Sequence, residues 1–274
     1  MTNREEFGTD YQERMERAQS SWWVSSMHEL GRQLLKAIPP DARVLDIGCG
    51  TGATLRWVAP NARESVGVDV SIEGLAVARE TAPGSRLAVA SAAGLPFADK
   101  TMDIVVSTDV LQHLRTEDRQ AALREMHRVL VPGGRILVRT NAKSLRKGVA
   151  ERADWQLIRG SVLRREAEDA GLVCERMTHA NAAGAVASAL GELRSRSRLG
   201  DVRHDDVHSH HHDHHALDGH HHGLGIPKPR SPLIERLGAT VAAAERCVIV
   251  RAGRDLPIGH TLYLVGTRPR TATA

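Results

Sequence analysis

Short apolar runs alternate with amphipathic stretches along this chain. The amphipathic stretches repeat their hydrophobic side chains at the spacing of a helix face. The apolar runs are too short for helices and are bounded by glycine, proline or acidic residues, which is typical of buried strands. We predict strands at residues 44–47, 65–70, 87–89, 102–108, 135–138, 172–177 and 261–266. The pattern therefore predicts a protein of mixed helices and strands.

The N-terminal part of the chain has a helical pattern that stops at Pro39 and Pro40. Its hydrophobic side chains group on one face, namely Trp22, Trp23, Met27, Leu30, Leu34 and Leu35. We therefore expect residues 1–40 to form a helical cap, packed against a core domain at residues 41–180.

A long segment separates the last two predicted strands, so we expect an insertion at residues 181–258 and a final core strand with its tail at 259–274. Within the insertion an amphipathic helix is predicted after Pro232. Its apolar face consists of Leu233, Ile234, Leu237, Val241 and Ala244. We expect this face to dock on the domain, and the alternative is that it covers an apolar substrate.

The insertion also contains a histidine-rich run at residues 204–222, which holds ten of the fifteen histidines of the chain. Imidazole clusters capture zinc, nickel or copper readily. A specific metal site needs fixed geometry, and nothing in this run fixes it. We therefore expect a disordered loop and assign no metal ligands.

The whole-chain composition favours a soluble globular protein. Hydrophobic residues are 41% of the chain and charged residues 26%, and no apolar run is long enough to predict stable membrane insertion. The 37 basic and 33 acidic residues leave a net charge of +4, which is too small and too scattered to predict nucleic-acid binding. The pattern says nothing of the oligomeric state.

Cysteine usage and the N-terminal sequence favour a cytoplasmic location. Cys49, Cys174 and Cys247 lie far apart without a C-x-x-C motif, which implies neither a disulfide framework nor a zinc site. The N-terminus is too polar for a signal peptide. We therefore expect the protein to stay in the reducing cytosol.

A glycine-rich turn follows the first predicted strand, with Gly48, Gly50 and Gly52 at every second position. Backbone without side chains can lie against a ligand, and the start of the next helix offers free N–H groups to a polar or anionic group. Gly48, Gly50 and Ala53 also fit the G-x-G-x-x-A pattern of dinucleotide-binding proteins. The turn predicts a small-molecule site, and a nicotinamide or flavin remains an alternative.

Two acidic residues narrow the choice of ligand. Asp46 lies two positions before the first glycine, where a carboxylate is poorly placed beside a diphosphate but well placed beside a cationic amine. Asp69 ends the second predicted strand, and a carboxylate there can accept hydrogen bonds from both hydroxyls of a ribose. Asp69 suits NAD and S-adenosylmethionine equally, so Asp46 is the residue that distinguishes them.

These segments resemble class I S-adenosylmethionine-dependent methyltransferases of the type 11-like family. Residues 46–52 match the first family motif, and Asp69 matches its ribose acid. Residues 91–97 are similar to the family segment D-A-x-x-L-P-F, except that Ser91 replaces the usual acid, and a hydroxyl accepts a hydrogen bond more weakly. Residues 102–114 resemble the segment F-D-x-V-x-x-x-x-V-L-x-H-L.

A further segment favours this family over a dinucleotide-binding one. Residues 128–134, with the sequence R-V-L-V-P-G-G, resemble the family landmark R-V-L-x-P-G-G. A dinucleotide-binding fold has no reason to carry it at this distance from the glycine turn. The resemblance covers residues 44–140 well, extends weakly to residue 177 and returns at the last predicted strand.

The resemblance implies a fold, a cofactor and a reaction. The fold is an α/β, seven-stranded, mostly parallel Rossmann-like methyltransferase sheet flanked by helices. The cofactor is S-adenosyl-L-methionine, and the acceptor is an O, N or C nucleophile of a small molecule, for example an apolar secondary metabolite or a quinone-like compound. The residues implied to hold the cofactor are Asp46, Gly48, Cys49, Gly50, Gly52, Asp69, Val70, Ser91, Ala92 and Thr108. Aromatic residues of the cap, Tyr11, Trp22 and Trp23, either contact ligand or only pack.

His113 is the candidate catalytic residue. It follows the fourth predicted strand, at the edge of the sheet where open α/β sheets bind ligands, and an imidazole with a pKa near neutral can act as a general base. The alternative is a structural or cofactor-side role. Two other functions stay open, a nucleotide-binding oxidoreductase and an inactive methyltransferase fold whose histidine-rich loop binds metal.

Overall fold

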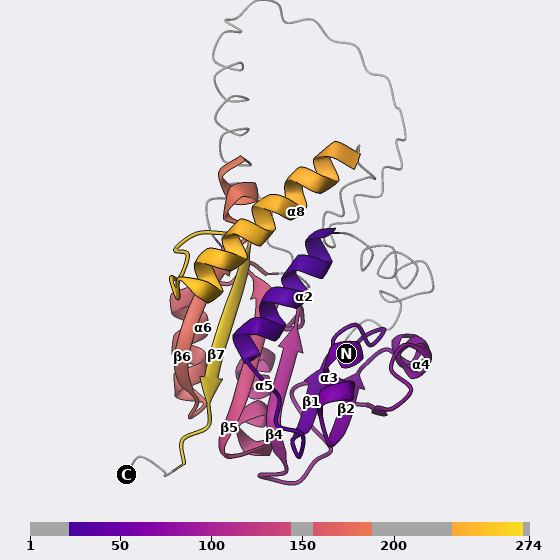
Figure 1. The fold of residues 1–274 in the computed structure, drawn as a ribbon. Coiled ribbons are helices and arrows are strands. Elements are labelled where there is room, and N and C mark those ends of the chain that lie inside the picture. Colours follow the sequence, from indigo (N-terminus) through magenta and orange to yellow (C-terminus); the bar gives the residue numbers. More distant parts are fainter. Residues whose placement is uncertain (1–21, 144–155, 188–231, 271–274) are drawn as a thin grey trace, which may run out of the picture.

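The computed structural model describes residues 22–143, 156–187 and 232–270. Within these ranges seven strands form one sheet in the order β3-β2-β1-β4-β5-β7-β6 (Figure 1). The strands are β1 (Arg43–Ile47), β2 (Glu64–Asp69), β3 (Arg86–Val89), β4 (Met102–Thr108), β5 (Leu130–Asn141), β6 (Val173–Ala180) and β7 (Thr261–Thr267). None of the helices in these ranges has the length and apolar character needed to cross a bilayer.

Strand directions confirm the predicted mostly parallel sheet. The pairs β3–β2, β2–β1, β1–β4 and β4–β5 are parallel, and β7 runs antiparallel to both β5 and β6. The chain proceeds outward from β1 through β2 to β3, and β4 and β5 then continue on the other side of β1. The strand order therefore reverses between β1 and β4, and open α/β sheets bind their ligands at the carboxyl ends of the strands at such a point.

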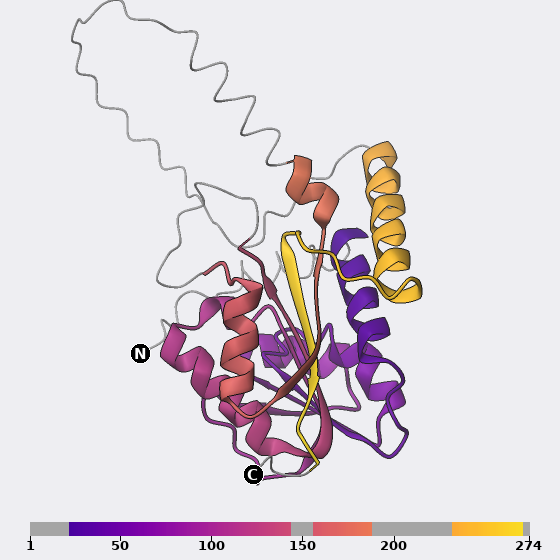
Figure 2. The same cartoon turned by 90° about the vertical axis from the view of Figure 1, so that its left-hand side faces the viewer.

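Helices cover both faces of the sheet (Figure 2). On one face, α2 packs through Met27, Leu30 and Leu34 on the buried strand residues Ile104 and Val106. The helices of the described ranges are α2 (Trp22–Leu35), α3 (Leu55–Val58), α4 (Ile72–Thr81), α5 (Thr116–Val129), α6 (Gly160–Asp169) and α8 (Pro232–Arg246).

The opposite face of the sheet is covered by α5 and α6. Leu123 and Met126 of α5 and Leu163 of α6 pack in one cluster with Val105 and Ile136. Successive residues of β4 thus point into different buried layers, which explains why its sequence is apolar at nearly every position rather than at every second one.

The segment Val131-Pro132-Gly133-Gly134 belongs to β5, which begins at Leu130, earlier than the strand predicted at residues 135–138. Its pairing with β4 shifts register in this stretch, from Met102 opposite Leu130 to Ile104 opposite Arg135. Gly133 has φ +82°, and a Cβ on Gly134 would lie 2.8 Å from the carbonyl oxygen of Val131. The chain stays extended because its backbone pairs with Arg268 beyond β7, through Gly133 N–H to Arg268 O and Arg268 N–H to Gly134 O.

Helix α8 lies beside α2 (Figure 1), but with a different face inward from the one expected. Leu237 is 64% exposed and Val241 36%, whereas Ala242 is buried. The prediction that Leu237 and Val241 dock on the domain is therefore wrong. The side chains of Tyr11, Trp22, Trp23, Leu233 and Ile234 and the histidine-rich run lie outside the residues whose side chains are described.

Candidate functional site

The glycine turn between β1 and α3 has a backbone that only glycine adopts easily. Gly48, Gly50 and Gly52 have φ of +71°, +49° and +85°. The turn is held against β2, because the N–H groups of Gly48 and Cys49 both donate to the carbonyl of Val68, at 2.8 and 3.0 Å. The three glycines thus serve a fixed, tight loop at the carboxyl end of β1.

The three glycines differ in what surrounds them. A Cβ on Gly48 would lie 2.0 Å from Cγ2 of Val110, and one on Gly52 would lie 3.2 Å from Ala78. A Cβ on Gly50 would meet nothing within 4 Å. Gly48 and Gly52 therefore let the protein pack closely on itself, and Gly50 presents bare backbone to open space where a ligand can approach.

Asp46 of β1 is fully buried, and neither carboxylate oxygen has a hydrogen-bond partner among the described residues. Burial raises the pKa of Asp46 to about 8; the nearby Asp69 adds to the rise and Arg139 opposes it. A buried carboxylate normally has its hydrogen bonds satisfied. The unsatisfied carboxylate beside the open backbone of Gly50 is the arrangement that a cationic ligand group would complete.

Asp69 is held rigidly at the carboxyl end of β2. Its two oxygens accept from the N–H groups of Gly50 (2.7 Å) and Ser71 (2.9 Å). Ser71 in turn caps α4 by accepting from the N–H of Gly74 at 3.0 Å. Burial raises the pKa of Asp69, and the backbone N–H groups of Ser71, Gly50 and Val70 counteract part of that effect. A carboxylate has about four acceptor sites, so capacity remains for a ligand hydroxyl.

An exposed apolar patch lies beside Asp69. Val70 is 48% exposed, Ile72 54% and Val89 58%, and Val89 is the β3 partner of Asp69 in the sheet. Exposed aliphatic side chains next to a polar anchor suit the flat face of an aromatic ligand group. Val70 belongs to the predicted set, whereas Ile72 and Val89 were missed because an apolar residue in a strand or at a helix start is normally interior.

Ser91 and Ala92 follow β3 next to this patch. Ser91 is exposed and its hydroxyl accepts from the N–H of Ala93 at 3.2 Å, and Ala92 is buried. The segment continues to Leu95, whose N–H donates to the Glu125 carboxylate at 2.7 Å. Arg128 donates to the Leu95 carbonyl at 3.1 Å, so α5 fixes the loop from both backbone groups of one residue.

A second polar cluster lies under α2, at the carboxyl ends of β4 and β5. Asp109 follows β4 with φ +62°, and its carboxylate forms an ion pair with the buried guanidinium of Arg139. The hydroxyl of Tyr263 donates to the Met27 carbonyl of α2 at 2.7 Å. Arg139 and Tyr263 are register partners in β5 and β7, so the cluster joins α2 to three strands.

His28 of α2 faces this ion pair. The pKa of His28 is lowered to about 3, mainly by burial and also by Arg139, while Asp109 opposes the change. The imidazole is therefore neutral at physiological pH and can exchange hydrogen bonds without carrying charge. His28, Asp109 and Arg139 were missed from the sequence, because a single histidine in a helix and a single arginine in a strand form no pattern.

The structure places Thr108 and His113 near this cluster. Thr108 ends β4, and its hydroxyl lies 3.3 Å from that of Thr54. His113 ends a short 3₁₀ helix, Leu111–His113, one turn farther along, with its backbone N–H donating to the Val110 carbonyl. The role of His113 as a base stays a prediction.

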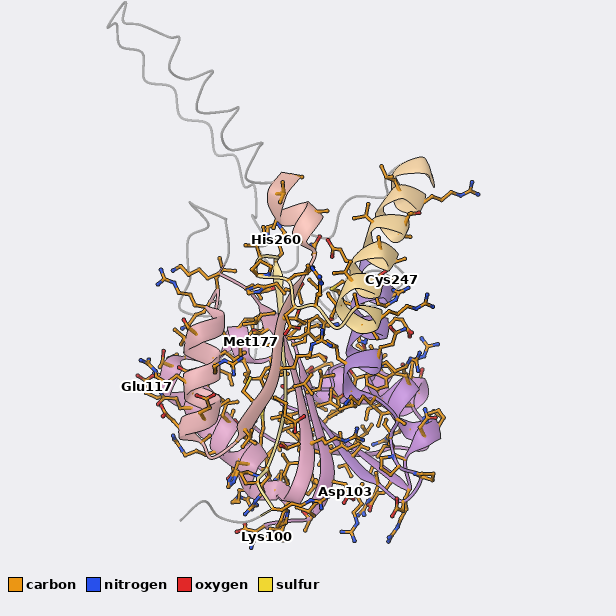
Figure 3. All side chains as sticks on the ribbon, turned by 60° about the vertical axis from the view of Figure 1, so that its left-hand side comes forward. Lys100, Asp103, Glu117, Met177, Cys247 and His260 are labelled. Carbon is orange, nitrogen blue, oxygen red and sulfur yellow. The ribbon has the colours of Figure 1, made fainter. Side chains whose placement is uncertain are left out.

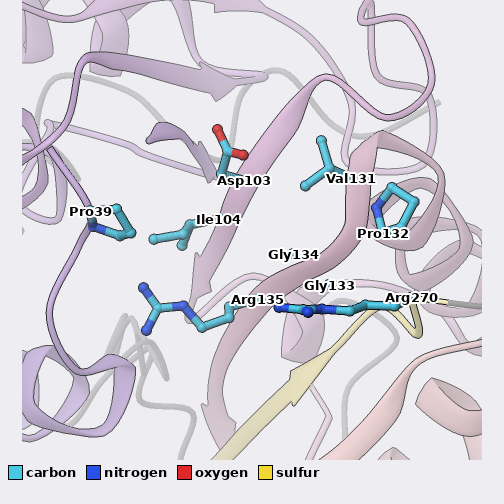
Figure 4. Close-up of a pocket in the computed structure, with 9 residues that line it drawn as sticks. All are labelled: Pro39, Asp103, Ile104, Val131, Pro132, Gly133, Gly134, Arg135 and Arg270. Atoms are coloured by element: carbon cyan, nitrogen blue, oxygen red, sulfur yellow. The ribbon is translucent and has the colours of Figure 1, made fainter. Parts of the chain in front are cut away.

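A separate hollow of about 280 Å³ lies at the other end of β4 and β5 (Figure 4). Figure 3 shows the two ends of the sheet, with Lys100 and Asp103 at one and His260 at the other. In the hollow, Arg135 donates to the carbonyls of Leu35 and Ala37, both at 2.7 Å, which satisfies backbone at the end of α2. This hollow is far from the glycine turn and contains none of the predicted site residues.

The fold and this site together define a class of protein. Residues 45–138 match the sequence model of the family described as methyltransferase domain. The match supports a methyltransferase of class I, with S-adenosyl-L-methionine as its cofactor, as predicted.

Named relatives are similar to this chain over parts of their length. Probable tRNA methyltransferase 9B of Bos taurus is 35% identical over 39% of this chain and 23% of its own length. Malonyl-[acyl-carrier protein] O-methyltransferase of Methylococcus capsulatus is 35% identical over 48% of this chain and 50% of its own. The chain thus spans about a quarter to a half of the length of these relatives.

One solved structure extends the likeness in fold to most of the chain. The S-adenosylmethionine dependent methyltransferase from Mesorhizobium loti superimposes with a TM-score of 0.55 and 16% identity. The superposition covers 90% of this chain and 100% of the other. At this identity the likeness concerns the fold alone.

Proposed function

We propose that this protein transfers the methyl group of S-adenosylmethionine to an O, N or C nucleophile of a small molecule. The observation that carries the proposal is Asp46, a fully buried carboxylate whose oxygens have no partner among the described residues. Such a group is costly for the fold unless a cationic ligand completes it. The ammonium group of the methionine moiety has the matching charge. It is part of S-adenosylmethionine, the cofactor of the methyltransferases that this domain resembles.

Each remaining cofactor residue has a defined role in this proposal. Gly50 gives the ligand access to the backbone, and Asp69 accepts from the ribose hydroxyls. The apolar patch around Val70 contacts the adenine face, and Ser91 with the N–H of Ala92 contacts the adenine edge. Gly48, Cys49, Gly52 and Thr108 shape the wall around the methionine end.

S-adenosylmethionine supplies a methyl group that is already activated by a positive sulfur, so the reaction is an in-line displacement. The protein must then orient the acceptor and exclude water. The cluster of His28, Asp109 and Arg139 is suited to the first task, because it presents fixed polar groups under α2 at the ligand edge of the sheet. His113 is the proposed base where the acceptor must lose a proton.

A small-molecule acceptor is favoured over tRNA, although one relative is named a tRNA methyltransferase. The chain has a net charge of only +4, and nucleic-acid binding usually requires a concentrated basic surface. Another relative, named an O-methyltransferase of a malonyl group on acyl-carrier protein, acts on a small acyl group.

The test is isothermal titration calorimetry of the purified chain with S-adenosylmethionine, S-adenosylhomocysteine and, separately, NADH. We expect binding of the first two and none of NADH. Absence of heat with both adenosyl ligands contradicts the proposal. Mass spectrometry of compounds that copurify with the protein, followed by assays of methyl transfer to them and to bulk tRNA, then tests the acceptor class.

A further inference from the structure

The proposed cofactor has two charged groups at its methionine end, and Asp46 is a partner for only one of them. The ammonium group and the carboxylate are attached to the same carbon atom, so their partners in the protein should lie close together. The carboxylate needs a hydrogen-bond donor, and a positive charge nearby would strengthen the contact. Its partner should therefore be a donor that lies near Asp46 and is not already used by the protein.

The backbone of the glycine turn is poorly suited to this role, because the protein already uses most of its donors. The N–H groups that donate to protein oxygens are those of Gly48, Cys49, Gly50 and Gly52. Helix α3, which follows the turn, has only four residues, so few peptide dipoles add up at its start. These observations favour a donor from another element at the ligand edge of the sheet.

Helix α2 packs against β5 and brings its first turns to that edge (Figure 1). Arg135 holds the C-terminal end of α2 through the contacts described above. Closer to the carboxyl end of β5, the hydroxyl of Tyr263 donates to the Met27 carbonyl at 2.7 Å. Between these contacts, a Cβ on Gly31 would lie 3.4 Å from Cδ2 of Leu137. The helix therefore runs antiparallel to β5, with its N-terminal half toward the ligand edge.

This arrangement places His28 over Arg139. His28 lies one helical turn before Gly31 on the same side of α2, and Arg139 is the next residue of β5 on the face that Leu137 occupies. One turn of helix and two residues of strand each advance by about 5 to 7 Å, so the two side chains stay in step. In agreement with this position, the charges of Arg139 and Asp109 both act on the imidazole.

Asp46 is close to the same guanidinium. It is in register with Val106 of β4, and Val106 is in register with Leu137 of β5, so the three side chains share one face of the sheet. Arg139 follows on that face, and its charge lowers the pKa of Asp46. Asp46 thus approaches the guanidinium from the sheet and His28 approaches it from α2, as the two partners of a zwitterion would.

The imidazole of His28 has hydrogen-bonding capacity that the described residues do not use. The side chain is half-buried, and none of the described residues forms a hydrogen bond with its ring. Arg139, in contrast, donates from Nε and Nη2 to Asp109. We propose, on the basis of the proposed function, that His28 donates a hydrogen bond to the carboxylate of the cofactor's methionine moiety, beside the positive charge of Arg139.

The charge state of His28 suits this contact. With a pKa of about 3 the imidazole is neutral and keeps one N–H, while Arg139 supplies the positive charge. Because α2 also covers the proposed acceptor site, His28 lies where the cofactor and the acceptor meet. The methionine end of the cofactor site is thus completed by a helix that precedes the glycine turn in the sequence.

Calorimetry with two ligands that differ only in the carboxylate tests this assignment. S-adenosylhomocysteine has the carboxylate, and decarboxylated S-adenosylhomocysteine keeps the amine and lacks it. We expect the unmodified chain to bind the decarboxylated ligand about tenfold more weakly. We expect His28→Ala to weaken the binding of S-adenosylhomocysteine about tenfold and to leave that of the decarboxylated ligand unchanged.

Two further variants separate a direct contact from a loss of structure. His28→Gln keeps an N–H donor, so it should retain most of the difference between the two ligands. Ser25→Ala changes an exposed residue of α2, and this control should bind both ligands like the unmodified chain. A general disturbance of α2 would weaken both ligands together and leave their ratio unchanged.

If His28→Ala weakens both ligands equally, or neither, His28 does not bind the carboxylate, although the proposed function still stands. Absence of S-adenosylhomocysteine binding to the unmodified chain contradicts the proposed function itself. Circular dichroism establishes that the variants are folded. If His28→Ala is not, NMR of the histidine ring nitrogens in the unmodified chain decides, with the His28 signal identified from His28→Gln. This signal should shift with S-adenosylhomocysteine and not with the decarboxylated ligand, and equal responses to both would overturn the assignment.

Discussion

Two buried carboxylates in this protein have opposite surroundings. Glu166 of α6 is 3% exposed, and both its oxygens accept from the guanidinium of Arg119, at 2.7 and 2.8 Å. Asp46 of β1 is 0% exposed and has no hydrogen-bond partner among the described residues. Both side chains are acids with nearly the same burial, so the difference between them lies in the partner.

The comparison distinguishes a carboxylate that stabilises the fold, Glu166, from one that we propose binds a ligand, Asp46. Arg119 and Glu166 connect α5 to α6, on the face of the sheet away from α2, and both oxygens of the carboxylate accept a hydrogen bond from the guanidinium. Asp46 lies near the open backbone of Gly50, and no hydrogen bond from the described residues compensates for the burial of its carboxylate. Stability should therefore depend on Glu166, and cofactor affinity on Asp46.

The largest expected effect is on stability, from Glu166→Gln. Loss of one charge leaves the Arg119 guanidinium buried without its counter-ion, which should lower the free energy of unfolding by about 3–5 kcal/mol. Urea unfolding measures this loss. The control is Glu168→Gln, because the Arg164–Glu168 pair is largely exposed and should matter little. Similar losses in both variants would mean that burial does not distinguish the two pairs.

Asp46→Asn should produce the reverse result. The affinity for S-adenosylhomocysteine is expected to fall about 100-fold, because a ligand ammonium loses its charged partner in a buried site. The stability of the ligand-free protein should stay unchanged or rise, since an unsatisfied buried acid is removed. Calorimetry and thermal unfolding measure the two quantities. Asp41→Asn, at an exposed position near β1, serves as the control.

If Asp46→Asn destabilised the protein while leaving affinity intact, the roles assigned to the two carboxylates would be exchanged. The proposed function would then no longer be supported by the buried, unpaired carboxylate of Asp46.

The pH dependence of stability offers a smaller but more specific test. The pKa of Asp46 is about 8 in the folded protein and about 3.9 in an unfolded chain. Its stabilising contribution is therefore fully present below pH 4 and is lost as the pH rises to about 8. The unfolding temperature of Asp46→Asn should rise relative to that of the unmodified protein as the pH increases from 5 to 8. A difference that is constant with pH would contradict the raised pKa.

Ligand binding provides a second measure of the same ionisation. A cationic ligand favours the charged form of Asp46, so binding near pH 7 should release up to about one proton. Calorimetry in buffers of different ionisation enthalpy detects this proton, and Asp46→Asn should abolish its release. His28 has a lowered pKa of about 3 and stays neutral throughout this range, so it contributes no proton.

The turn and the acidic residue of the proposed cofactor site could be predicted from the sequence because their determinants are local. Gly48, Gly50 and Gly52 have positive φ within one five-residue loop, and Asp69 ends the next strand. Residues close together in the sequence thus determine both the shape of the glycine turn and the position of the Asp69 carboxylate. The strand pattern was equally readable, and the bounds predicted for β4 agree with the structure because its two buried faces leave an uninterrupted apolar run.

The proposed acceptor half of the site was not predictable, because it depends on contacts between distant segments. His28, Asp109, Arg139 and Tyr263 meet only after α2 crosses the sheet and β7 inserts beside β5. The wrong face predicted for α8 has a similar cause. An apolar stripe predicts that a helix packs against something. The tertiary structure decides which of its residues face the domain.

The smallest expected effect concerns Ser91, where the protein has a hydroxyl in an exposed position. Ser91→Asp should tighten S-adenosylhomocysteine binding only a few-fold, because an exposed carboxylate that accepts from an amine is screened by water. Ser91→Asn is the matched control, since it has a similar shape and no charge.

Equal tightening by Ser91→Asp and Ser91→Asn would indicate shape rather than charge, and no change in either would remove Ser91 from the adenine edge. The contrast with Asp46 is one of burial. A carboxylate gained at Ser91 competes with solvent for its partner, whereas the carboxylate lost in Asp46→Asn has no solvent to replace it. The same charge should therefore change affinity a few-fold at one end of the cofactor and about 100-fold at the other.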